Sequence, residues 1–266
     1  MVSMHILKKQ FDTREELITF VRFLAPWAEG EQSIIQGGRH HAEMQLDNID
    51  PIGYAHTRNF GDGKISGLSP YIHHGVLSLN EVRNHALTTC KQATQISKFI
   101  QELAWRDFWQ RALAAHPDWA WNDIEPYKTG LTPNDYSDHL PEDIARGKTG
   151  TACMDAFIKE LIDTGYIHNH ARMYLASYVV HFRRVKWQTG ARWFLRHLLD
   201  GDLASNNLSW QWVASTFSNK PYIFNLENVD KYFGTLIDTS PLANQPLNAS
   251  YEDLHVRLFP NIKGAS

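Results

Sequence analysis

The stretch that constrains the fold most reads Asp200-Gly201-Asp202-Leu203-Ala204-Ser205-Asn206-Asn207-Leu208-Ser209-Trp210-Gln211-Trp212. Its carboxylates and amides flank the start of a helix, and the plainest interpretation is a turn with a Ser or Asn N-cap. Two carboxylates can also hold a divalent cation, and a free carboxylate can equally accept a hydrogen bond from a ring N–H. The Trp-Gln-Trp that follows is too aromatic for a helix surrounded by solvent. This stretch therefore makes a ring-binding site worth considering.

Helical periodicity dominates the rest of the chain. A helix is expected to start at residues 11–13, and others to cover residues 38–49, 94–115, 151–165, 169–187 and 191–199, with the last starting near Ser205. Residues 50–70 are rich in Gly, Pro, Asn and Asp and are expected to form a loop, and residues 117–150 a loop with short helical pieces. No β alternation extends beyond four residues. The sequence therefore predicts an all-α fold in a single domain over residues 1–266.

Composition narrows the class of protein. The 266 residues carry a net charge of -3, so no global basic field indicates nucleic-acid binding. Two cysteines cannot supply a four-thiolate zinc site or an iron–sulfur cluster, and they suit a reducing cytoplasm. No apolar run approaches a membrane span of about 18 residues, and the N-terminus has no signal-peptide pattern. We therefore expect a cytoplasmic protein without a membrane segment.

The nine tryptophans are the unusual feature of this composition, because several lie within polar helices. In the helix over 94–115, Glu102, Trp105, Arg106 and Trp109 follow i, i+3, i+4, i+7 spacing and therefore share one face. That face offers a carboxylate, two indoles and a guanidinium. The alternative is a Glu–Arg surface pair beside buried tryptophans.

A second group of polar side chains lies at the start of the helix over 169–187, where Asn169, Arg172 and Met173 share a face. His168 and His170 diverge at i, i+2 spacing on a helix, which disfavours a metal site, and the same caution covers the other His pairs. We therefore expect no metal. Farther upstream, the Ser and Gly residues of Ile65–Tyr71 precede a helix start and can cradle a phosphate through backbone N–H groups.

Taken in this order, these segments resemble the FAD-binding domain of the cryptochrome/DNA photolyase family. The resemblance covers about residues 37–233, and its most specific part is the string from Asp200 to Trp212. It implies an all-helical domain that holds FAD in a bent form, with reduced FAD as the active state. The family's N-terminal α/β antenna domain has no counterpart here, so no antenna chromophore is expected.

The resemblance also implies which residues hold the cofactor. Tyr54, Ser66, Gly67, Leu68 and Ser69 would surround the diphosphate and ribityl region, and Arg106 would be another neighbour. Arg172 would pair with Asp200 near the isoalloxazine, with Asp202 close to the polar edge of the ring and Asn206 facing flavin N5. For photoreduction, Trp210 and Trp187 match the inner two members of the family's tryptophan chain. The alternative for both indoles is a purely structural role in the core. Trp119, Trp121 and Tyr136 are candidates for another electron-transfer route out of the core.

Five residues match the lesion pocket of cyclobutane pyrimidine dimer photolyases: Glu102, Trp105, Asn169, Met173 and Trp212. Two indoles can hold a flipped dimer, and the carboxylate and amide can hydrogen-bond its base edges. The resemblance therefore implies a deoxyribodipyrimidine photo-lyase, a carbon–carbon lyase that repairs UV-damaged single- or double-stranded DNA by electron transfer from reduced FAD. We expect a monomer, with a preference for single-stranded DNA left open.

Two departures weaken the expected DNA or phosphate contacts, because His170 stands where Arg is common and Ile65 where Thr is common. The alternatives are a cryptochrome-like flavin photoreceptor without repair activity and a nucleic-acid-binding module that has lost FAD. A (6-4) photoproduct enzyme is disfavoured because Asn169 stands where that branch has a second His.

Overall fold

The computed structural model describes residues 8–27 and 32–262, and within these ranges the fold is all-α. The expectation that no signal peptide is present concerns residues 1–7, which lie outside them. No strand occurs in the described part of the chain, where only an isolated bridge joins Ser137 and Val185. The helical elements are α1 (Arg14–Leu24), α2 (Arg39–Asp47), α3 (Pro51–Thr57), α4 (Ser69–His73), α5 (Leu79–Thr88), η1 (Ala93–Ile96), α6 (Ser97–Ala115), η2 (Pro117–Ala120), η3 (Pro133–Asp135), α7 (Glu142–Ala145), α8 (Ala152–Thr164), α9 (Asn169–Ser177), η4 (Tyr178–Phe182), α10 (Trp187–His197), α11 (Leu203–Ala214), α12 (Leu226–Phe233), η5 (Leu242–Leu247) and α13 (Tyr251–Leu258).

The larger hydrophobic core lies among α8, α9, α10, α11 and α12. α8 shows why its sequence folds as it does: it begins after Thr151, buries Phe157 and Leu161 on its apolar face, and ends at Gly165. Gly165 takes a φ of 71°, the left-handed conformation that glycine adopts at low cost as a C-cap. This helix is confirmed as the sequence predicted it.

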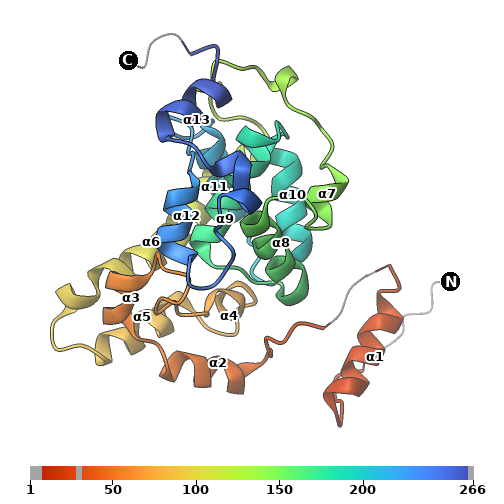
Figure 1. Ribbon diagram of the computed structural model, residues 1–266. Helices are drawn as coiled ribbons and strands as arrows, with labels where there is room; N and C mark the ends of the chain where they lie inside the picture. The colour runs from red at the N-terminus through yellow and green to blue at the C-terminus, as the bar shows by residue number, and fades with distance from the viewer. Residues whose placement is uncertain (1–7, 28–31, 263–266) are drawn as a thin grey trace.

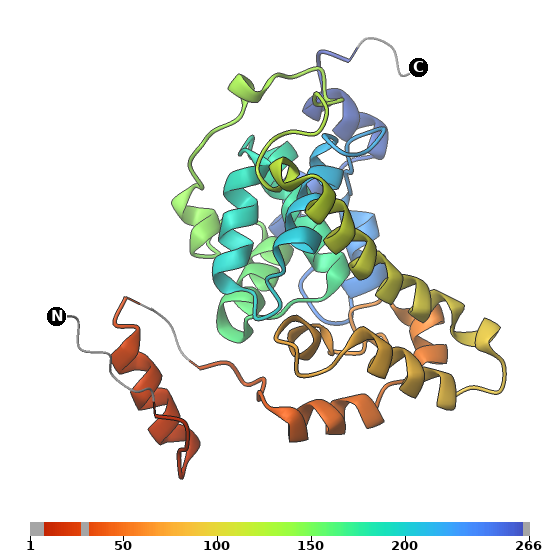
Figure 2. The same ribbon diagram turned by 180° about the vertical axis from the view of Figure 1, so that it is seen from behind.

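A smaller core lies among α2, α4, α5 and the start of α6, around Leu68, Val82 and Phe99. Figures 1 and 2 show α6 running between this group and the larger bundle of α8 to α12. The predicted helix start near Thr13 is confirmed, because the Thr13 side chain caps α1 by accepting from the N–H of Glu16. α1 buries none of its residues and lies apart from the two groups in both views (Figures 1 and 2).

The prediction of one helix over residues 169–187 is wrong. The chain passes from α9 into η4, a π-helical turn, and Arg184 then takes a φ of 53° before α10 begins. The N–H of Ser137 donates to the carbonyl of Arg184 at 2.7 Å, and the N–H of Lys186 donates to the carbonyl of Ser137 at 2.9 Å. The helix ends because a distant segment supplies backbone partners at this point, which local periodicity does not reveal.

Three further expectations need correction. Residues 50–70 are not only loop, because α3 and α4 lie there and Asp50 caps α3 by accepting from the N–H of Gly53 at 2.8 Å. α5, with a capping box between Ser78 and Glu81, was not predicted. The helix after Asp202 is not the last, since α12 and α13 follow α11. Among the helices of the described residues, none is both long enough and apolar enough to span a membrane.

Candidate functional site

A cleft of about 600 Å³ lies between the two helical groups, with residues of α3, α4, α6, α9, α10 and α11 in its wall. Thirteen of the seventeen residues predicted from the sequence line it, including all five residues of the predicted lesion pocket. These thirteen are Tyr54, Ser66, Ser69, Glu102, Trp105, Arg106, Asn169, Met173, Arg172, Asp200, Asn206, Trp210 and Trp212. Segments separated by more than 100 residues are therefore brought together at one place.

The other four predicted residues, Gly67, Leu68, Trp187 and Asp202, are not among the residues that line the cleft. Leu68 and Trp187 have at most 1% of their surface exposed, so their side chains face the protein core. Asp202 caps α11 by accepting from the N–H of Ser205 at 2.7 Å, and its carboxylate lies 3.6 Å from Arg106. Gly67 has a φ of 64°, a conformation that favours glycine at this turn.

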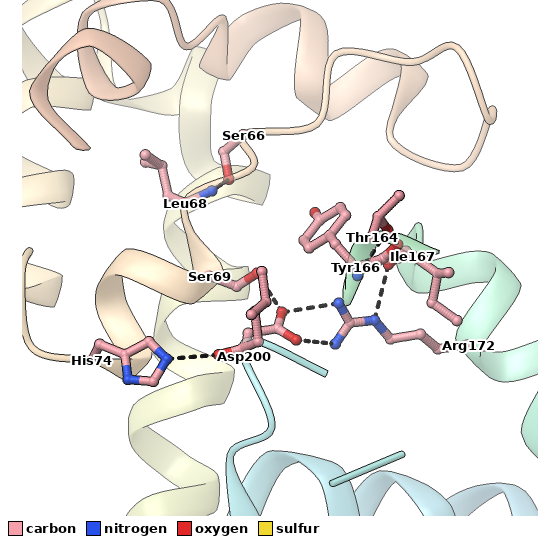
Figure 3. Close-up of polar contacts among 10 residues, drawn as sticks. Ser66, Leu68, Ser69, His74, Thr164, Tyr166, Ile167, Arg172 and Asp200 are labelled. Atoms are coloured by element: carbon pink, nitrogen blue, oxygen red, sulfur yellow. Dashed lines mark hydrogen bonds and ion pairs between the residues drawn. The ribbon is translucent and has the colours of Figure 1, made fainter. Parts of the chain in front are cut away.

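An ion pair between Arg172 on α9 and Asp200 before α11 fixes one side of the cleft (Figure 3). Nη1 and Nη2 of Arg172 donate to the two carboxylate oxygens at 3.0 and 2.9 Å, and Nε donates to the carbonyl of Ile167 at 3.0 Å. The hydroxyl of Ser69 also donates to Asp200. Burial acts to raise the pKa of the Asp200 carboxyl, but the charge and hydrogen bonds of Arg172 outweigh burial, and the pKa is lowered.

Glu102 lies on the opposite wall, on α6, between two cations. Its Oε1 lies 2.9 Å from Arg58, at the end of α3, and 2.9 Å from Lys98, one turn earlier on α6. The alternative of a Glu102–Arg106 surface pair is wrong, because Arg106 approaches Asp202 instead.

The charges of the cleft differ in sign from the charge of the whole chain. The lining holds four cations, Arg58, Lys98, Arg106 and Arg172, against the two carboxylates Glu102 and Asp200. The chain as a whole carries -3. A cleft with excess positive charge favours an anionic ligand.

Half-exposed aromatic rings mark the mouth of the cleft. Trp105 is 43% exposed and Trp212 is 41% exposed, although indoles are costly to leave in water. Trp105 also stacks on Trp109, with ring centroids 5.4 Å apart and planes inclined by 24°. Flat apolar surfaces of this kind suit a ligand with rings of its own.

Unpartnered polar atoms of α11 also line the cleft. The Nδ2 of Asn206 donates to the carbonyl of Ala191 at 3.1 Å and to Oδ1 of Asn207 at 2.9 Å, so its Oδ1 remains as an acceptor. Oγ of Ser205 and Nε1 of Trp210 are buried without a partner among the described residues. An unsatisfied buried polar group costs about 1–3 kcal/mol, which a ligand that pairs with it can recover.

Comparisons with known proteins assign the family. Residues 99–238, more than half of the chain, match the family described as the FAD binding domain of DNA photolyase. The chain belongs to this DNA photolyase family. A curated deoxyribodipyrimidine photo-lyase of Streptomyces griseus is 39% identical over 151 residues, covering 57% of this chain and 32% of the relative. One from Synechococcus is 33% identical over 219 residues, covering 78% of this chain and 44% of the relative.

A solved structure resembles the fold as a whole. The class III photolyase of Agrobacterium tumefaciens aligns with a TM-score of 0.62 and 29% identity, over 85% of this chain and 46% of that one. This photolyase-family chain therefore spans less than half of the length of these relatives. The prediction of an all-α FAD-binding domain of this family is confirmed.

The residues of this photolyase-family cleft fit FAD. Its volume lies in the range of roughly 300–1,000 Å³ typical of ligand sites. The excess of two positive charges suits a diphosphate, and the exposed indole of Trp105 suits a ring system. Asn206 Oδ1 and Ser205 Oγ supply polar contacts that the protein itself leaves unused. No three His, Cys, Asp or Glu side chains within residues 8–27 and 32–262 could hold a metal ion.

The predicted electron-transfer tryptophans lie in the larger core. The Trp210 ring packs on Gly190 of α10, where an added Cβ would come within 2.3 Å of the ring. Nε1 of Trp187 donates to Oδ1 of Asp123 at 2.6 Å. The rings of the three candidates for another electron-transfer route contact other side chains. Trp119 stacks on His116, Trp121 lies under the guanidinium of Arg192 and Tyr136 stacks on Tyr127.

His170, which stands where the family commonly has Arg, is turned into the protein. Its Nδ1 lies 3.0 Å from the carbonyl of Asn59, and its ring stacks on Tyr174 with centroids 4.5 Å apart. Burial lowers the pKa of His170, which favours the neutral ring over the charged one.

Several lining residues were missed by the sequence analysis. Arg58 and Lys98 contact Glu102, and Tyr166 lies with its ring 5.3 Å from the guanidinium of Arg172. Lys98 stands one helical turn before Glu102, so i, i+4 pairing could have identified it. Arg58 and Tyr166 come from other segments, and no local pattern connects them to the site.

Proposed function

We propose that this chain binds FAD in the cleft between its two helical groups and uses light to repair cyclobutane pyrimidine dimers in UV-damaged DNA. One observation carries the proposal: the five lesion-pocket residues and the Arg172–Asp200 pair line the same cleft. The curated photo-lyase relatives and the family match support photolyase-type chemistry.

The contacts around Trp105 and Trp212 support binding of a base taken out of the helical stack. Both indoles expose more than 40% of their surface at the mouth of the cleft, and an extruded base is held by aromatic faces and hydrogen bonds to its edges. Asn169 is exposed there and can pair its amide with a base edge, while Met173 supplies an adaptable apolar wall.

Glu102 is the group that acts on the dimer by hydrogen bonding. Arg58 and Lys98 contact its Oε1, which fixes the carboxylate, and Oε2 would be the oxygen that accepts from the substrate. When bound, reduced FAD supplies a light-excited electron that splits the cyclobutane ring and is then recovered. Asn206 offers Oδ1 to an N–H of the ring system, and the Arg172–Asp200 pair holds the other wall in place.

The experiment begins with the absorption spectrum of the purified protein, which should show bound flavin. The protein is then reduced with dithionite and illuminated with near-UV or blue light in the presence of oligonucleotides that carry one thymine dimer. Light-dependent recovery of intact thymines supports the proposal. Bound flavin without repair would favour the cryptochrome-like photoreceptor, and a colourless protein that still binds damaged DNA would favour the module without FAD.

A matched pair of variants tests the site. Trp105→Ala should abolish dimer repair, while Trp27→Ala, which removes an indole that is 76% exposed outside the cleft, should leave repair unchanged. Normal repair by Trp105→Ala would refute the assignment of the pocket. Running single- and double-stranded substrates in parallel tests the strand preference, which we propose to favour single strands because the whole chain is negatively charged.

A further inference from the structure

The two buried tryptophans of the predicted electron-transfer chain differ in one respect, the partner of the indole N–H. Trp210 lines the cleft, and its Nε1 is buried without an acceptor among the described residues. Nε1 of Trp187 donates to the carboxylate of Asp123 at 2.6 Å, a short, charge-assisted hydrogen bond. This difference decides where a positive charge can be neutralised.

The two rings belong to one packed unit. The Trp210 ring lies against Gly190, which stands three residues after Trp187 on α10 and therefore on the same face of that helix. Both indoles are at most 2% exposed. Trp210 thus lies between the cleft and the α10 face that carries Trp187, and solvent cannot take a proton from either ring directly.

We propose that Asp123 is the proton acceptor of Trp187 when oxidised flavin in the cleft is photoreduced. This rests on the proposed function, because it requires flavin in the cleft. One electron passes from Trp187 through Trp210 to the photoexcited flavin, and the indole N–H bond of Trp187 breaks. The proton forms an O–H bond on Asp123, so that a neutral indolyl radical and a neutral carboxylic acid remain in place of a radical cation and a carboxylate.

Among the described residues, the other groups that contact this site do not compete for the proton. Nε2 of Gln188 donates to the same Asp123 oxygen at 3.1 Å and is not basic. Burial, and next the charge of Asp123, raise the pKa of the Tyr127 phenol, which therefore stays protonated. Asp123 itself is half-buried, so the acquired proton has a route to solvent.

Loss of this proton makes Trp187 the last residue of the electron-transfer chain. An indole radical cation can take its electron back from the flavin, whereas the neutral radical returns only after it regains a proton. An outer tryptophan is then not needed for a lasting charge separation, and a small thiol reductant in solution can restore the indole by giving one electron while Asp123 returns the proton.

Asp123→Asn is the decisive variant, because an amide oxygen still accepts the N–H of Trp187 but is not a base. Transient absorption after a laser flash on the oxidised protein should show the neutral indolyl radical in the wild type, formed more slowly in D₂O than in H₂O. In Asp123→Asn the neutral-radical absorption should be lost, the cation spectrum should persist until recombination, and net flavin bleaching should fall. Glu125→Gln, an exposed carboxylate of the same segment paired with Lys128, should behave as the wild type.

A readout that needs no flavin checks the hydrogen bond itself. In a ¹⁵N spectrum of indole groups, the Trp187 proton, assigned by its loss in Trp187→Phe, should lie downfield and move upfield in Asp123→Asn without loss of the other signals. Unchanged radical deprotonation in Asp123→Asn, no difference between H₂O and D₂O, or an unshifted indole resonance would each overturn the inference.

Repair and photoreduction are assayed separately, so the two proposals can fail independently. Asp123→Asn reduced with dithionite should still repair dimers, since its flavin no longer needs Trp187. Absence of dimer repair by the chemically reduced wild type would contradict the proposed function. Repair retained together with a normal neutral radical in Asp123→Asn would contradict only the role of Asp123.

Discussion

Replacing Asp200 with Asn keeps the shape of the side chain and removes its charge from a buried ion pair. The carboxylate side chain is 3% exposed and that of Arg172 is 22% exposed, so the guanidinium would remain largely out of water without a charged partner, left with the Ile167 carbonyl and the neutral amide oxygen of the new side chain. Breaking a buried pair by removing one charge costs about 3–5 kcal/mol. Because Arg172 is partly accessible, we expect a loss near the lower end, about 3 kcal/mol of unfolding free energy.

Urea unfolding followed by circular dichroism measures this loss. At about 2–4 °C per kcal/mol for a chain of this size, thermal unfolding should shift down by about 6–12 °C. Asp107→Asn is the control, because it breaks an exposed i, i+4 pair with Arg111 and should cost only about 0.3–0.5 kcal/mol. If the unfolding free energy of Asp200→Asn lay within about 0.5 kcal/mol of the wild-type value, the pair would not stabilise the cleft.

The pH dependence of the wild type gives an independent check on Asp200. Its pKa is lowered in the folded chain, so its stabilising contribution is fully present above the unfolded value of about 3.9. That contribution is lost as the pH falls through the lower folded pKa. The stability difference between the wild type and Asp200→Asn should therefore be constant from pH 7 to 5 and shrink only in stronger acid.

Three other changes give separate tests. Trp212→Ala should weaken binding of a dimer-containing oligonucleotide by about 1–3 kcal/mol, roughly 5- to 150-fold in a fluorescence anisotropy titration, and leave the unfolding free energy nearly unchanged. His181 is fully buried, and burial lowers its pKa to about 4. The unfolding free energy should therefore decrease by up to about 3 kcal/mol as the pH is lowered from 6.5 to 4. In urea unfolding, His181→Gln should reduce this pH dependence. Gly190→Ala should cost about 1–3 kcal/mol because its Cβ meets the Trp210 ring, and a stabilised variant would contradict this packing.

The sequence predicted helix ends correctly where capping residues next to the helix determine them. Thr13 caps α1, and Gly165 closes α8 in a left-handed conformation, and both were expected from residue type and spacing. The failure at Arg184 has a different cause, since its conformation depends on backbone bonds to Ser137, more than 40 residues away. Interactions between distant segments leave no period in the sequence.

The candidate site shows the same limit. Most of the residues that the resemblance to a family implied line one cleft, because such a resemblance carries three-dimensional information that spacing alone lacks. It did not anticipate that Arg58 and Lys98 hold one oxygen of Glu102, or that His170 turns into the protein against Asn59. These contacts depend on the side chains of this chain and become visible only when the segments are brought together.

The aromatic face of α6 ties the site to the stability of the fold. Of its nineteen residues only Phe99 is buried, while Trp105, which lines the cleft, remains 43% exposed. A helix gains most of its stability from burying an apolar face, and i, i+4 pairs such as Lys98–Glu102 add only about 0.2–0.5 kcal/mol each. The face that α6 turns to the cleft is therefore incompletely buried, and a bound ring system would cover its exposed apolar surface. Binding and folding are coupled for this reason, because a ligand at 100 times its Kd adds about 2.7 kcal/mol to the unfolding free energy.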